Sequence, residues 1–75
     1  MNTSRIPLAP AELETLHCAL RLAGPRAADA LATRAGVNAN TVHRASAGEP
    51  VQRATVRVLL VACREVIAEE VRAAA

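Results

Sequence analysis

Residues 31–47, LATRAGVNANTVHRASA, constrain the fold more than any other stretch of this 75-residue chain. Gly36 stands between two short apolar patterns, and glycine can adopt the positive φ angle that a tight corner between two helices needs. Ala32 is small enough to let the second helix approach closely, and Val42 is expected to point into the angle between the helices. The expected neighbours of Val42 are Leu31, Ala35, Val37 and Ala45. The stretch therefore predicts two short helices joined at Gly36.

The second of these helices is predicted to carry a largely polar outer side. Facing away from Val42, the pattern places Ala39, Asn40, His43 and Arg44. A short helix that is backed by a hydrophobic angle and offers amide, imidazole and guanidinium groups outward suits the major groove of DNA. The alternative is a plain helical hairpin that uses the same corner only for packing.

The run AGVNANTVHR resembles the helix-turn-helix of the lambda-repressor-like superfamily, which includes the Cro/XRE regulators and the LacI headpiece. The string T-V-x-R, followed by G-x-x-V-x-x-x-T, resembles LacI-type headpieces in particular. The resemblance covers roughly residues 26 to 60. It implies a small helical domain that binds double-stranded DNA in a sequence-specific manner.

The resemblance also implies which side chains contact the bases. In the family, base edges are contacted by the first two positions of the second helix and by the residue two after the inward-pointing valine. With His43, which matches a position that contacts phosphates or bases, the predicted base-contacting residues are Ala39, Asn40, His43 and Arg44. Asparagine can pair bidentately with adenine, and arginine with guanine. A surface ion pair is the alternative for Arg44, and a non-specific surface role is the alternative for His43.

Phosphate contacts are expected on both sides of this helix. The predicted set is Arg26, Asn38, Thr41, Gln52, Arg53 and Arg57. The resemblance lays the segment around Arg53 and Arg57 along the DNA backbone, with solvated charge as the alternative. The chain departs from the family at Ala28, where Cro/XRE proteins usually carry a polar residue that holds a phosphate. At the start of the helix that contains Ala28, the backbone N–H groups and Arg26 are then expected to donate hydrogen bonds to a phosphate.

Composition limits the core. The chain has no Phe, Tyr or Trp, so its core must be built from Leu, Val and Ala, which bury less apolar area per side chain. A chain of this length makes one domain near the lower limit for a self-supporting core. We expect a flexible arm over residues 1–8, with a minor-groove contact by Arg5 as the alternative, and one all-α domain over 9–75. The four predicted helices span residues 10–23, 26–35, 39–47 and 52–73.

The last predicted helix carries two apolar stripes, and a three-helix core of this size covers only one of them. The first stripe is Val58, Leu59, Ala62 and Val66, and the second is Val56, Leu60, Cys63, Ile67 and Val71. An apolar stripe left in water usually marks an interface. We therefore expect a homodimer with the second stripe at its seam. The alternative is a C-terminal helix surrounded by its own domain.

Charge and cysteine usage narrow the function. Residues 26–60 carry five arginines against two acids, whereas residues 61–75 carry two arginines against three acids, so positive charge coincides with the predicted DNA-reading segment. Cys18 and Cys63 lack metal-ligand spacing and are typical of small thiols in a reducing cytosol. We expect no metal, cofactor, small-molecule ligand or membrane span. We also expect no enzymatic activity, because no clustered carboxylates, glycine-rich phosphate loop or nucleophile–histidine motif occur.

These features together favour a cytoplasmic DNA-binding regulator of bacterial or phage type, associated with the nucleoid when bound. The expected mechanism is a dimeric repressor or controller protein that occupies paired half-sites in a promoter operator, and by family analogy regulates its own operon. Two alternatives act mainly through protein–protein binding, namely an antitoxin or antiactivator and a helical adaptor. Sequence-specific DNA binding that survives competitor DNA separates the regulator from the adaptor.

Overall fold

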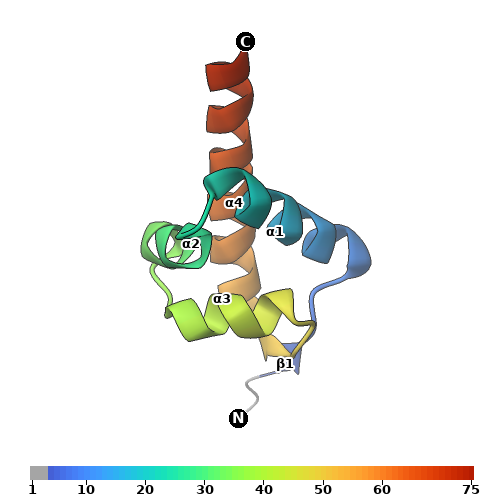
Figure 1. Cartoon of the computed structure of the whole chain (residues 1–75). Coiled ribbons are helices and arrows are strands. Elements are labelled where there is room, and N and C mark those ends of the chain that lie inside the picture. The colour runs from blue at the N-terminus through green and yellow to red at the C-terminus, as the bar shows by residue number, and fades with distance from the viewer. Residues whose placement is uncertain (1–3) are drawn as a thin grey trace.

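The computed structural model describes residues 4–75, and most of them are helical. The helices are α1 (Pro10–Ala23), α2 (Ala27–Ala35), α3 (Ala39–Ser46) and α4 (Arg53–Ala74). Two short strands, β1 (Arg5–Ile6) and β2 (Val51–Gln52), pair antiparallel. The prediction of a compact, mostly helical domain with four helices is confirmed. Figure 1 shows α1, α2 and α3 gathered around the first half of α4, whose C-terminal end projects beyond them.

Local signals explain where the first helix begins and ends. Pro10 occupies its first position, where the missing N–H leaves no hydrogen bond unmade. The backbone N–H of Ala9 donates to Glu12 Oε1 at 2.8 Å, which satisfies one free donor and places a carboxylate at the positive end of the helix dipole. Gly24 ends the helix. Similar helix stop signals occur at Gly36 and around Pro50, so the sequence itself divides the chain into short helices.

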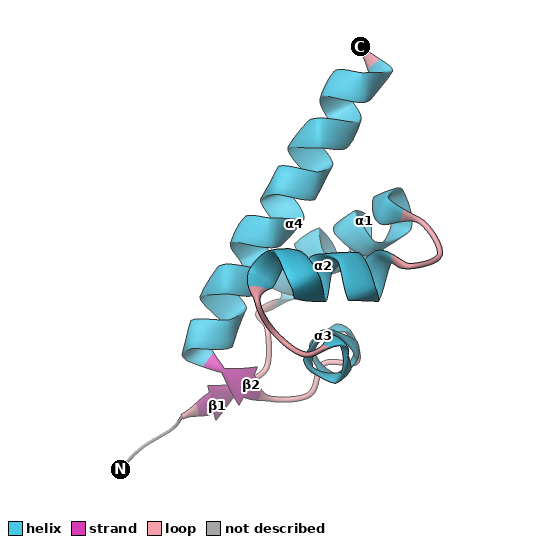
Figure 2. Ribbon diagram, turned by 90° about the vertical axis from the view of Figure 1, so that its left-hand side faces the viewer, coloured by secondary structure: helices cyan, strands magenta, loops and turns pink. Residues whose placement is uncertain are grey.

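The core is aliphatic and draws on all four helices. Its largest fully buried side chains are Leu16, Leu31, Val42, Leu59 and Cys63. They come from α1, α2, α3 and α4, so each helix contributes to one cluster. Figure 2 shows α4 running past the other three helices, with α1 and α2 beside it and α3 near its N-terminal end. Packing on this cluster fixes the direction of α3.

The prediction of a flexible arm over residues 1–8 is wrong for residues 5–8. Residues 1–3 lie outside the described part of the chain. Ile6 pairs with Val51 and Arg5 pairs with Gln52 in the β1–β2 ladder. Leu8 is buried in the core, with 6% of its surface exposed. This short segment carries two apolar side chains, Ile6 and Leu8, and their packing against the domain holds the backbone in place.

The predicted division of the α4 stripes is also wrong. Val56, Leu60 and Cys63, assigned to a dimer seam, are only 6%, 7% and 0% exposed in the single chain. The physical reason is that α4 packs against both α1 and α2, so more than one stripe is covered. Of the predicted seam, Ile67 is half-buried and Val71 is 63% exposed. The three buried residues are core residues and are not available to a partner.

Candidate nucleic-acid interface

The corner between α2 and α3 depends on Gly36. This residue has φ 74° and ψ 31°, in the left-handed region that side-chain-bearing residues rarely adopt. Its N–H donates to the Thr33 carbonyl oxygen at 3.3 Å, and the N–H of Val37 donates to the Ala32 carbonyl oxygen at 2.9 Å. A Cβ placed on Gly36 would meet no atom within 4 Å. Glycine is therefore required here by backbone conformation and not by close packing.

The start of α3 is held by a side-chain cap and an inward valine. Asn38 Oδ1 accepts a hydrogen bond from the backbone N–H of Asn40 at 2.9 Å, as expected of an N-cap. Val42 and Ala45 are fully buried, and with Leu31 they fill the angle between the helices. The predicted inward position of Val42 is confirmed. The cap uses Asn38 Oδ1 internally, and within residues 4–75 the side-chain NH2 of Asn38 donates no hydrogen bond.

The C-terminal end of α3 is tied to α1 by His17. The imidazole Nε2–H of His17 donates to the Ser46 carbonyl oxygen across 2.8 Å, and the imidazole is half-buried. This carbonyl belongs to the last residue of α3, where the intrahelical ladder leaves acceptors free. The Ser46 hydroxyl in turn donates to the His43 carbonyl oxygen at 2.8 Å. Both ends of α3 are therefore positioned by side chains, although nothing in the sequence pairs His17 with residue 46.

The outward side of α3 carries the residues predicted to contact bases. Asn40, His43 and Arg44 are exposed, whereas Ala39 is half-buried. Thr41, assigned to a phosphate, is also half-buried. Figure 1 shows α3 at the end of the molecule opposite the C-terminal end of α4, close to β1. One face of the molecule thus presents an amide, an imidazole and a guanidinium group to solvent.

The other predicted phosphate contacts fall in different places. Arg26 precedes α2 and lines a surface hollow with Asp29, to which α3 contributes no residue. Arg53 and Arg57 are exposed in the first turns of α4. Arg57 lines a groove of about 280 Å³ with Val58, and not the hollow that holds Arg44. The structure therefore groups only part of the predicted set.

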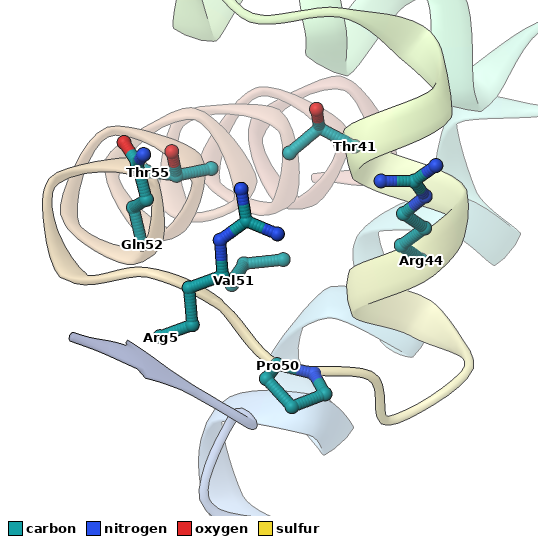
Figure 3. Close-up of a pocket in the computed structure, with 7 residues that line it drawn as sticks. All are labelled: Arg5, Thr41, Arg44, Pro50, Val51, Gln52 and Thr55. Carbon is teal, nitrogen blue, oxygen red and sulfur yellow. The ribbon is translucent and has the colours of Figure 1, made fainter. Parts of the chain in front are cut away.

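The grouped part is a hollow of about 220 Å³ between α3, β1 and the start of α4 (Figure 3), called here the two-arginine pocket. Its walls are Arg5, Thr41, Arg44, Gln52 and Thr55, and Pro50 and Val51 complete it. Three of these residues, Thr41, Arg44 and Gln52, are predicted DNA contacts. Two others, Arg5 and Thr55, are absent from the predicted set. The sequence offers Arg5 only as an alternative minor-groove contact, because its place in this hollow depends on the β1–β2 pairing, which no local pattern indicates.

The electrostatics of this face differ from those of the α2–α4 side. Within residues 4–75, the ion pairs all involve Arg34, which lies 2.7 Å from Glu69 and 3.5 Å from Glu65. Hydrogen bonds from Arg34 lower the pKa of Glu69. In the described part of the chain, Arg5 and Arg44 have no carboxylate within ion-pair distance. Their positive charge is left uncompensated and faces solvent.

Comparison of the chain with protein-family models, curated proteins and solved structures finds no match in any of the three. Within residues 4–75, no helix has the combined length and apolar character needed to cross a membrane. The function must therefore be argued from the surface itself. That surface offers a rigidly held short helix, exposed hydrogen-bonding side chains and unneutralised arginines.

Proposed function

We propose that this chain is a sequence-specific regulator of transcription that binds double-stranded DNA, acting as a dimeric repressor or controller at a promoter operator. The observation that carries the proposal is that α3 is held at both ends and along its inner side. Gly36 and the Asn38 cap hold its first turn, His17 holds its last, and Val42 anchors its inner side. A helix held this firmly can present side chains to the major groove in one orientation.

The proposed roles of the outward residues follow from their chemistry. The Asn40 amide suits a bidentate contact with adenine, and His43 can donate to a base edge or a phosphate. Ala39 offers only a short apolar contact, such as one with a thymine methyl group. Arg53 and Arg57, exposed at the start of α4, would approach the DNA backbone as positioning contacts.

The proposal includes two copies of the chain on paired half-sites. Because Val56, Leu60 and Cys63 belong to the core, contact between copies is assigned to the projecting end of α4. Ile67 and Val71 are the apolar side chains of the predicted seam that remain accessible there. A second copy packed on this end would leave both α3 helices free to face DNA.

The proposal is tested by selecting duplexes from a random-sequence pool and then titrating the selected duplex against random duplex at two salt concentrations. We expect tight binding that survives competitor, with two chains per duplex. Asn40→Ala should cost about 1–3 kcal/mol on the selected duplex and less on random duplex. Arg53→Ala is the matched control, because loss of a backbone contact weakens both duplexes alike.

The alternative outcomes are distinct. Equal, strongly salt-dependent binding to selected and random duplexes would contradict sequence-specific recognition. No binding at low salt would contradict any role on DNA and would favour a helical adaptor that acts through protein–protein contacts. Equal losses for Asn40→Ala on both duplexes would remove Asn40 from the base-reading set.

A further inference from the structure

We propose that the two-arginine pocket binds one phosphate group of the DNA backbone, with Arg5 and Arg44 as its two cationic donors. The inference rests on the proposed function for the identity of the ligand. It assigns a binding role to Arg5 and moves Arg44 from the base-reading set to the phosphate-binding set. The observations that carry it are the placement of the two arginines around one hollow and the polar residues that line it with them.

Three separate segments of the chain bring the donors together. Arg5 comes from β1, Arg44 from α3, and Gln52 and Thr55 from the start of α4. Figure 3 shows Arg5 and Arg44 on two sides of the hollow, with Thr41 near Arg44 and with Gln52 and Thr55 on the Arg5 side. The β1–β2 ladder places Arg5 at this hollow, because Arg5 is opposite Gln52 in its register.

The chemistry of the pocket fits an oxyanion. Arginine presents planar donors that match phosphate geometry, and hydroxyl and amide side chains add neutral donors. The walls contain no carboxylate, and in residues 4–75 neither arginine forms an ion pair. The hollow of about 220 Å³ far exceeds the roughly 10–15 Å³ that a cavity needs to hold one water, so a phosphate group has room to enter.

The two-arginine pocket lies apart from the residues that would contact bases. Arg44 lines the pocket beside the start of α4, whereas Asn40 and His43 are not among its walls. A phosphate held there would lie between α3 and α4 and fix how deeply α3 enters the groove. Contacts of this kind set register and orientation without carrying sequence information.

The first test uses inorganic phosphate and the intact chain. Phosphate is titrated at constant ionic strength, with chloride as the balancing anion, and the backbone amides are followed by NMR. We expect saturable shifts at Arg44, Gln52 and Thr55, which disappear in Arg5→Ala and in Arg44→Ala. Arg21→Ala, an exposed arginine of α1 outside the pocket, is the matched control and should keep the shifts. Circular dichroism confirms that each variant is folded.

The second test uses the selected and random duplexes. Arg5→Ala and Arg44→Ala should each weaken both duplexes by the same factor and make the salt dependence shallower by about one unit of slope. A loss confined to the selected duplex in Arg44→Ala would overturn its assignment to phosphate. Unchanged binding in Arg5→Ala would overturn the pocket itself.

The two tests separate the inference from the proposed function. Phosphate shifts that depend on both arginines, without any duplex binding, would support an oxyanion pocket and contradict the DNA-binding regulator. Selective duplex binding without phosphate shifts would support the regulator and overturn the pocket. Agreement of both tests supports a backbone phosphate as the ligand.

Discussion

The two ends of α4 carry the same apolar repeat, but its side chains are buried at one end and accessible at the other. In Arg53–Val66, six residues of the helix are buried, whereas none is buried from Ile67 onward. At 1.5 Å per residue, the 22 residues of α4 extend about 33 Å, whereas the 14 residues of α1 extend about 21 Å. The comparison shows that periodicity determines which face is apolar, and that the length of the neighbouring helices determines how much of it is covered.

The largest expected effect breaks the buried half. Leu60→Glu introduces a carboxylate where the native side chain is 7% exposed and has apolar neighbours. Burial of an unpaired charge, together with the loss of a packed leucine, should remove more than about 3 kcal/mol of the free energy of unfolding. Urea unfolding followed by circular dichroism measures this loss, and we expect the variant to be largely unfolded.

The matched substitution at the projecting end is Val71→Glu. Because Val71 is 63% exposed, the free energy of unfolding of the single chain, measured below the concentration at which copies pair, should change by no more than about 0.5 kcal/mol. Sedimentation of the same variant tests the proposed pairing of two copies, and we expect its mass to fall to that of one chain. Equal unfolding midpoints for the Leu60 and Val71 variants would contradict the contrast between the two halves.

A smaller effect, the pH dependence of the free energy of unfolding, also concerns the buried half of α4. Burial raises the pKa of the Cys63 thiol from 9.0 to about 11, so between these values the unfolded chain loses a proton that the folded chain keeps. The free energy of unfolding should therefore fall as pH rises from about 9 to 11, by about 2 kcal/mol, and be unaffected below 9. Urea unfolding at a series of pH values measures it. Cys63→Ala should abolish the slope, whereas Cys18→Ala, which removes a half-buried thiol on α1, should retain it.

The smallest effect concerns the link between the projecting end and the body. Arg34 donates to both carboxylate oxygens of Glu69, at 2.7 and 2.9 Å. Because these bonds lower the pKa of Glu69, their contribution is present above the usual glutamate pKa and is lost as pH falls through the lowered value. Glu69→Gln should speed amide exchange over residues 67–74 at neutral pH without moving the global midpoint.

Glu65→Gln is the control for this link. Glu65 lies 3.5 Å from the same guanidinium and makes no bidentate contact, so its replacement should change the exchange rates less. Both pairs are exposed, and exposed ion pairs contribute little to global stability. Faster exchange throughout α4 in Glu69→Gln would contradict a purely local role.

The helices were predictable because their ends are marked locally. Pro10 and Gly24 delimit the first helix, Gly36 and Asn38 set the corner, and Pro50 precedes the last helix. Each observed helix begins and ends within one residue of its predicted range. Such signals act over a few residues, so a single sequence displays them.

The errors came from contacts between distant parts of the chain. Pairing of Ile6 with Val51 and burial of Leu60 depend on how the helices assemble, which no window of the sequence contains. For the candidate site, the inward Val42 and the Asn38 cap were predictable from spacing. The placement of Arg5 was not, because it follows from the strand pairing.

The β1–β2 ladder also has a kinetic consequence. It joins two residues on each side across about 45 intervening positions, whereas the helices form from neighbours in sequence. We expect a ladder this short, closing a loop this long, to form late in folding and to open before the helical core does. The N-terminal strand can therefore separate from β2 while α1 to α4 stay folded, and each opening takes the Arg5 guanidinium away from Arg44.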